Sequence, residues 1–120
     1  MNIKLDPADI VFSEYIRRRD RHCLRCGKAG TGSKGITGLQ VSHYFGRGKE
    51  STRFDPENVD ALCFGCHQYW GSTDRESYRE FKISQLGYLS FQKLMIRANT
   101  LVKKDRKMEL IKAKLLLESL

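Results

Sequence analysis

The sequence predicts an α+β fold in which two short strands and a helix form a small core between helices at both ends of the chain. Three observations lead to this prediction. The four cysteines form two Cys-x-x-Cys pairs, Cys23/Cys26 and Cys63/Cys66. Residues 39–44 alternate between apolar and polar side chains, which is typical of a strand with one buried face. The flanking segments have apolar residues at helical spacing, so we expect one domain, residues 1–120, with its core at residues 23–71.

The first element is expected to be a helix over residues 6–19. Asp6 can cap it, because a short polar side chain accepts hydrogen bonds from the free N–H groups of a first turn, and Pro7 suits the first helical position. One face of this helix is apolar and consists of Ala8, Val11, Phe12, Tyr15 and Ile16. The helix ends in the basic run Arg17, Arg18 and Arg19, close to the first cysteine pair.

The two cysteine pairs together offer four thiolates, the number of ligands in a closed, tetrahedral zinc site. The residues between them, 27–62, exceed the spacing of a simple zinc ribbon, so a further element must lie between the pairs. A structural Zn²⁺ would also supply folding energy to a chain whose hydrophobic content, 40%, is low for a large core.

The second pair directly precedes His67, and Cys-x-x-Cys-His also fits c-type haem attachment or a redox or disulfide-forming pair. The N-terminus lacks the pattern of a secretory signal, and no apolar run reaches membrane-spanning length. We therefore expect a soluble, cytoplasmic protein without a membrane partner. Haem attachment and disulfides are disfavoured in the cytoplasm, so a zinc site is the better interpretation of the two cysteine pairs.

The segment between the cysteine pairs predicts a strand, a loop and a second strand. In the first strand Leu39, Val41 and His43 share one face. The sequence GRGKES then indicates a flexible basic loop, FDPEN a turn, and VDALC the second strand, which leads into Cys63. From Phe64 onward the chain can begin a helix that carries His67.

The C-terminal tail, residues 73–120, is expected to be helical. A helix begins at Thr73, with Glu76 completing a capping box, and ends near Gly87. Two more helices are expected near residues 90–99 and 104–119. The apolar positions of the last one either dock onto the core or pair two chains, and docking is favoured; they are Leu110, Ala113, Leu117 and Leu120. The chain is thus expected to be a monomer or a homodimer.

The sequences SHYFGR, RFDPENVDALC and CFGCHQYW, framed by the two cysteine pairs, resemble the HNH nucleases. The resemblance covers residues 23–70 and is greatest to the NinG-type recombination proteins of phages and prophages. It implies a treble-clef-like ββα-metal core held by a four-cysteine zinc. It also implies a metal-dependent endonuclease that hydrolyses phosphodiester bonds in branched or single-stranded DNA during phage recombination, in the cytoplasm of a bacterial host.

The resemblance also assigns roles to single residues. His43 matches the general base, and Asn58 matches the asparagine that braces the loop and positions that base. His67 matches a ligand of the catalytic divalent metal, Mg²⁺ or Mn²⁺. Such a histidine near its ordinary pKa can take a proton from water at neutral pH.

One departure from the family pattern is Ser42, because the position before the base is commonly an acidic metal ligand. The catalytic metal would then rely on water, on the substrate phosphate, or on a carboxylate from nearby such as Asp55 or Asp60.

The charge of the chain favours a polyanionic partner. Twenty-two Lys and Arg residues against fourteen Asp and Glu give a net charge of +8. Basic clusters lie at residues 17–21 and 103–107, as in proteins that bind a phosphate backbone. Arg47 and Arg53 flank the predicted active site, and a guanidinium suits contact with phosphate. The expected partner is DNA, with RNA as the alternative.

Each motif residue also has a simpler interpretation. His43 can be a hydrogen-bonded strand residue, Asn58 a turn residue, and His67 a neighbour or a replacement ligand of the zinc. The second functional hypothesis is therefore a non-catalytic zinc module that binds nucleic acid or a protein, with Ser42 marking a lost active site. His22, next to Cys23, receives no role.

Overall fold

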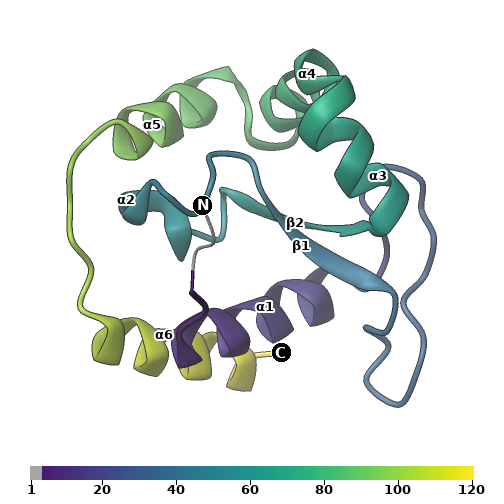
Figure 1. The fold of residues 1–120 in the computed structure, drawn as a ribbon, viewed down its shortest axis with the longest axis horizontal. Coiled ribbons are helices and arrows are strands. Elements are labelled where there is room, and N and C mark those ends of the chain that lie inside the picture. Colours follow the sequence, from purple (N-terminus) through teal and green to yellow (C-terminus); the bar gives the residue numbers. More distant parts are fainter. Residues whose placement is uncertain (1–3) are drawn as a thin grey trace.

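The structure is a computed structural model that describes residues 4–120. Within this range it has an α+β fold with six α-helices and one two-stranded antiparallel sheet (Figure 1). The elements in chain order are α1 (Pro7–Asp20), β1 (Leu39–His43), α2 (Glu50–Arg53), β2 (Val59–Cys63), α3 (Phe64–Gln68), the π-helical turn η1 (Tyr69–Thr73), α4 (Arg75–Leu86), α5 (Tyr88–Ala98) and α6 (Arg106–Glu118). The α+β prediction is confirmed.

The two strands form the centre of the molecule. They pair with Leu39 opposite Cys63 and His43 opposite Val59. In Figure 1, α1 and α6 lie on one side of the sheet, and α4 and α5 lie on the other. Both faces of β1 are therefore covered, and Ser42 is as deeply buried as Leu39. The alternation had predicted burial of the Leu39 face alone.

Helix α1 forms where the sequence predicts it, because its first turn is capped locally. The Asp6 carboxylate accepts a hydrogen bond from the Ala8 N–H at 2.9 Å, and the Asp9 carboxylate accepts one from the Asp6 N–H at 2.8 Å. Ala8, Phe12 and Ile16 are buried against the sheet and α6. The helix ends at Arg21, whose φ of 64° is left-handed and turns the chain toward the first cysteine pair.

The C-terminal helices follow the prediction with one correction. The cap of α4 is Asp74, whose carboxylate accepts from the Ser77 N–H at 3.0 Å, so the predicted Thr73/Glu76 capping box is wrong. The cause is η1, which extends the preceding helix through Thr73 and moves the start of α4.

Helix α6 docks along α1, as favoured from the sequence. Ala113 is buried in this contact, and Leu110 and Leu117 are partly buried. Leu120, which was expected to share the docking face, is 54% exposed, because α6 ends at Glu118.

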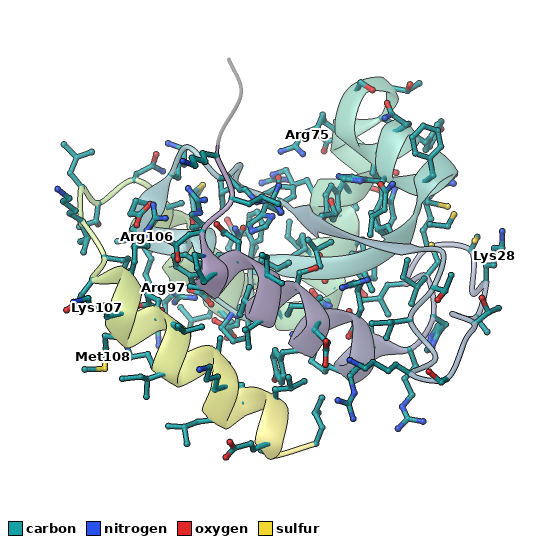
Figure 2. The ribbon with its side chains drawn as sticks, turned by 60° about the horizontal axis from the view of Figure 1, so that its bottom comes forward. Lys28, Arg75, Arg97, Arg106, Lys107 and Met108 are labelled. Carbon is teal, nitrogen blue, oxygen red and sulfur yellow. The ribbon has the colours of Figure 1, made fainter. Side chains whose placement is uncertain are left out.

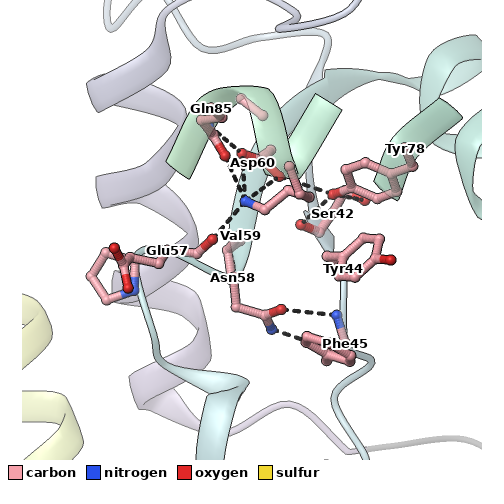
Figure 3. Close-up of polar contacts among 12 residues, drawn as sticks. Ser42, Tyr44, Phe45, Glu57, Asn58, Val59, Asp60, Tyr78 and Gln85 are labelled. Carbon is pink, nitrogen blue, oxygen red and sulfur yellow. Dashed lines mark hydrogen bonds and ion pairs between the residues drawn. The ribbon is translucent and has the colours of Figure 1, made fainter. Parts of the chain in front are cut away.

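A buried ion pair joins the sheet to α4 (Figure 3). The Lys82 ammonium lies 3.1 Å from the Asp60 carboxylate, and both side chains are fully buried. Asp60 also accepts hydrogen bonds from the Tyr78 hydroxyl at 3.0 Å and from the Gln85 amide at 2.9 Å. The same Tyr78 hydroxyl donates to the Ser42 hydroxyl. Every hydrogen-bond partner of the Asp60 side chain is thus supplied by α4, which fixes this helix against the sheet.

Replacing Lys82 by Met should lower the free energy of unfolding by about 3–5 kcal/mol, because it leaves the Asp60 charge buried without its cation. Chemical denaturation measures this change. The matched control is Lys112→Met, since the Lys112 side chain is 60% exposed and its pairing with Glu109 should contribute at most about 1 kcal/mol. Equal losses in the two variants would contradict the structural role of the buried pair.

Candidate functional site

The four cysteines, far apart in the sequence, meet at one end of the sheet. Their Sγ atoms all lie within 4.8 Å of one another, and the Cys26 and Cys63 sulfurs are 3.8 Å apart. All four are free thiols rather than disulfides. Four sulfurs at the corners of a tetrahedron, each about 2.3 Å from a zinc ion, would be separated by about 3.8 Å. The cluster therefore fits a structural Zn²⁺, as predicted from the two Cys-x-x-Cys pairs.

The first cysteine pair lies on a tight loop between α1 and β1. The Cys23 N–H donates to the Lys28 carbonyl at 2.8 Å, and the Gly27 N–H donates to the Cys23 carbonyl at 2.9 Å. Gly27 has a φ of 82°, which is costly for residues with a side chain. The Leu24 N–H donates to the Ala61 carbonyl at 3.0 Å, and this bond attaches the loop to β2.

The second pair lies at the junction of β2 and α3, where Cys63 ends the strand and Cys66 lies in the first turn of the helix. Burial raises the pKa of the Cys66 thiol to about 12, and the Arg25 guanidinium, 3.3 Å from its sulfur, opposes that rise. At Cys23 burial also opposes ionisation, but hydrogen bonds from backbone N–H groups outweigh it and lower the pKa to about 7. Metal binding requires all four thiols as thiolates, and these N–H and guanidinium donors help to stabilise that charge.

His43 ends β1 and is partly buried. Its Nε2 lies 3.0 Å from the Arg53 carbonyl oxygen. Because a carbonyl only accepts hydrogen bonds, Nε2 carries the proton and Nδ1 keeps the lone pair that a base requires. Burial, and secondly the nearby charge of Arg47, lowers the pKa of His43 to about 4. His43 is therefore neutral at physiological pH, but its pKa lies below the ordinary value expected from the sequence, so it is a weaker base than predicted.

His43 should make stability depend on pH. Between pH 6.5 and about pH 4 the unfolded chain binds a proton at His43 that the folded chain excludes, so stability falls as pH falls through this window. Above pH 6.5 this loss is absent. Relative to the wild type, His43→Gln should gain about 2 kcal/mol between pH 7.5 and pH 5, because glutamine does not titrate.

Chemical denaturation of both proteins at the two pH values measures this difference, with zinc content checked in each sample. Protonation of the cysteines affects the two proteins alike and cancels in the comparison. Parallel pH profiles would show that burial does not disfavour the charged form of His43.

Asn58 is fully buried and closes the loop between the strands (Figure 3). Its Oδ1 accepts from the Phe45 N–H at 2.8 Å, and its Nδ2 donates to the carbonyls of Phe45 at 2.9 Å and Thr52 at 3.0 Å. The Tyr44 N–H donates to the Asn58 carbonyl. These bonds hold the chain on the C-terminal side of His43, so Asn58 is placed as a loop brace.

His67 lies on α3, one residue after Cys66. Its Nδ1 is 2.7 Å from the Gln40 Oε1, which leaves Nε2 free as a ligand or acceptor. Burial and the Arg47 charge lower the pKa of His67. The sequence analysis missed Gln40, and the only signal was its position on the polar face of the alternating strand.

A second metal site is not preformed in the described part of the chain. Within residues 4–120 the cysteine cluster is the only group of three or more His, Cys, Asp or Glu side chains close enough to share an ion. The two carboxylates expected to supplement His67 have other partners. Asp60 is buried against Lys82, and Asp55 pairs with Arg97 at 2.9 Å. Neither carboxylate is placed in this structure to supplement His67 as a metal ligand.

The predicted nucleic-acid-binding arginines differ in accessibility. Arg53 is 4% exposed, because its guanidinium forms a buried, two-bonded pair with Asp9, so the prediction that it contacts phosphate is wrong. The Arg19 guanidinium donates hydrogen bonds to the carbonyls of Pro56 and Val59, so these donors are used within the fold. Arg17 and Arg18 bond only within α1, to Ser13 and Glu14.

The basic side chains do not gather at a single position. Figure 2 shows Lys28, beside the first cysteine pair, and Lys107, at the start of α6, at opposite ends of the molecule. In Figure 1 the end of α1 also lies far from the start of α6, so the predicted basic clusters at residues 17–21 and 103–107 belong to separate parts of the surface.

Comparisons with protein-family models, with curated proteins and with solved structures give no match to this chain. None of the helices within residues 4–120 is long and apolar enough to span a lipid bilayer.

Proposed function

We propose that the protein is a zinc-containing HNH-type endonuclease that hydrolyses phosphodiester bonds in DNA, with His43 as general base. The observation that carries the proposal is the environment of His43: a neutral, partly buried histidine that is held through Nε2 by a carbonyl and therefore keeps a lone pair on Nδ1. The four-cysteine cluster and the loop brace at Asn58 support it, because they match the roles that the family resemblance assigns to these residues.

In the proposed reaction His43 Nδ1 takes a proton from a water molecule, and that water attacks the phosphorus of the scissile phosphodiester. The bond between phosphorus and the 3′ oxygen breaks, and the departing 3′ oxygen takes a proton from solvent. The Arg53 carbonyl keeps the ring oriented and accepts a hydrogen bond from Nε2–H, which becomes stronger when the ring is positively charged. Asn58 contributes by holding the loop that follows His43, and does not contact the reacting atoms.

The family's catalytic Mg²⁺ or Mn²⁺ has one candidate protein ligand here, His67. Such ions usually bind through one or two carboxylates together with substrate phosphates, and no described Asp or Glu joins His67 in a cluster. The described residues therefore do not fit a complete catalytic metal site, and no step above depends on one.

The second candidate function is a non-catalytic zinc module that binds nucleic acid or a protein partner. One observation favours it. Ser42, at the position of the usual acidic ligand, is 3% exposed and hydrogen-bonded to Tyr78, so it belongs to the core rather than to an open site.

A cleavage assay separates the two candidates. Purified, zinc-loaded protein is incubated with linear duplex, single-stranded and four-way-junction DNA, and with RNA of the same sequence, in the presence of Mg²⁺, Mn²⁺ or EDTA. If the protein is a nuclease, at least one DNA substrate should be cleaved. A preference for the junction or the single strand would support the NinG-type assignment, which implies a phage protein that acts in the cytoplasm of a bacterial host. Binding without cleavage under every condition would favour the zinc module.

A further inference from the structure

Arg47 lies in the loop between β1 and α2 and has an unsatisfied donor. Its Nε is the one buried side-chain nitrogen or oxygen in the described chain that has no hydrogen-bond partner. A buried, unpaired donor on a charged group costs free energy, so such an atom in a folded protein calls for an explanation. Burial also lowers the pKa of Arg47, which means that its surroundings disfavour the positive charge.

The nearest compensating charge is already in use. Asp9 acts on Arg47 electrostatically, but its two carboxylate oxygens accept hydrogen bonds from Arg53 at 2.9 and 2.5 Å. Neither Asp9 nor any other acidic side chain among residues 4–120 forms a salt bridge with Arg47. Arg53 is therefore a neutralised, structural arginine, whereas Arg47 keeps an uncompensated charge.

The position of Arg47 links it to the predicted active site. Its charge acts on both His43 and His67, although these residues lie on different elements, β1 and α3. The adjacent Gly46 and Gly48 are exposed, and a Cβ added to either would meet no atom within 4 Å. The backbone on each side of Arg47 is thus open enough for a compact ligand to approach.

We propose that Arg47 is a phosphate anchor, a residue that binds a backbone phosphate of a nucleic acid beside His43 and His67. A guanidinium offers Nε–H and Nη–H as a parallel pair of donors that matches two phosphate oxygens. Such a ligand neutralises the charge, and it also satisfies Nε–H once the Arg47 side chain turns outward, because Nε is shielded from solvent in this structure. The nucleic-acid source of the phosphate rests on the proposed function, but anion binding at Arg47 does not.

The first test measures binding without catalysis. In ¹⁵N-labelled, zinc-loaded protein, titration with inorganic phosphate should shift the Nε–H resonance of Arg47 and the amide resonances of Gly46 and Gly48 in a saturable way. Sodium chloride at equal ionic strength and sodium acetate should not reproduce these shifts. Equal responses to acetate or chloride would overturn the anchor.

Variants assign the effect to the side chain. Arg47→Gln should abolish the saturable shifts at the two glycines, and Arg47→Lys should weaken them, because a lysine keeps the charge but loses the paired donors. Arg79→Gln makes the same charge change on α4, where the side chain is 45% exposed, and should bind phosphate as the wild type does. An unchanged response in Arg47→Gln would overturn the proposal.

A short single-stranded oligonucleotide with no terminal phosphate, added without Mg²⁺ or Mn²⁺, distinguishes a backbone phosphate from free phosphate. It should shift the same resonances, and Arg47→Gln should weaken its binding by about 10- to 100-fold. A response to inorganic phosphate alone would overturn the assignment to nucleic acid.

The two proposals fail independently. Arg47-dependent oligonucleotide binding in a protein that cleaves nothing would remove the nuclease function and keep the anchor. Cleavage by Arg47→Gln with wild-type kcat and KM would keep the nuclease and remove the anchor.

Discussion

Zinc-free protein should lose its cooperative thermal unfolding transition, and the Cys63→Ser variant should lose both the metal and the fold. The physical reason is that the cysteine cluster joins two separate segments at this end of the sheet: a tight loop before β1 and the junction of β2 with α3. Without metal, the four thiols make only weak van der Waals contacts with one another. Zinc binding replaces these contacts by four metal–sulfur bonds, and its free energy adds directly to the free energy of folding.

Metal analysis should find about one zinc per chain in protein purified under reducing conditions. Circular dichroism and calorimetry, before and after chelation, then measure the transition. His22→Ala is the matched control, because His22 adjoins Cys23 but is exposed and should leave zinc content and melting unchanged. A zinc-free protein that melts at the same temperature as the loaded protein would exclude a structural role for the metal.

Replacing His43 by Ala should lower turnover by about 10²–10⁴-fold, the usual contribution of a general base. Zinc content and DNA affinity should be unchanged, because the neutral ring neither binds the cluster nor pairs with phosphate. The structure adds one condition: His43→Ala removes the hydrogen bond to the Arg53 carbonyl, so its stability must be measured together with its rate.

Rates should be compared for wild type, His43→Ala and His22→Ala, purified in the same way, because a contaminating nuclease would survive both substitutions. Added imidazole should restore part of the activity of His43→Ala by occupying the space of the missing ring. Equal cleavage by all three proteins would refute the nuclease assignment and leave the zinc module as the better explanation.

Several features were predictable because they depend on residues close together in the chain. Asp6 and Pro7 define the start of α1 through bonds that span three residues. The two cysteine pairs have the same spacing and one chemical use in common, so their assembly into one cluster was expected before any geometry was known. The prediction of a helix cap at Thr73 was wrong for the opposite reason, because a π-helical turn depends on tertiary packing rather than on a local motif.

The contacts of charged and polar residues were not predictable in the same way. Arg53 and Arg47 have the same type and both flank His43 in sequence, yet Asp9, 44 residues from Arg53, pairs with Arg53 and leaves Arg47 unpaired. Asp60 was a candidate metal ligand until Lys82, 22 residues later, was found buried against it. Long side chains can reach many partners, and only the packed fold selects one.

The sequence by itself therefore determined the α+β class, the capped first helix and the clustering of the four cysteines, because local hydrogen bonding and ligand chemistry depend on residue type and spacing. Only the tertiary structure decided which arginine is free, which carboxylates are occupied, and that His43 is neutral with its Nε2 held by a carbonyl. These properties depend on distances between segments far apart in the chain and on burial, because burial disfavours the charged form of an ionisable side chain.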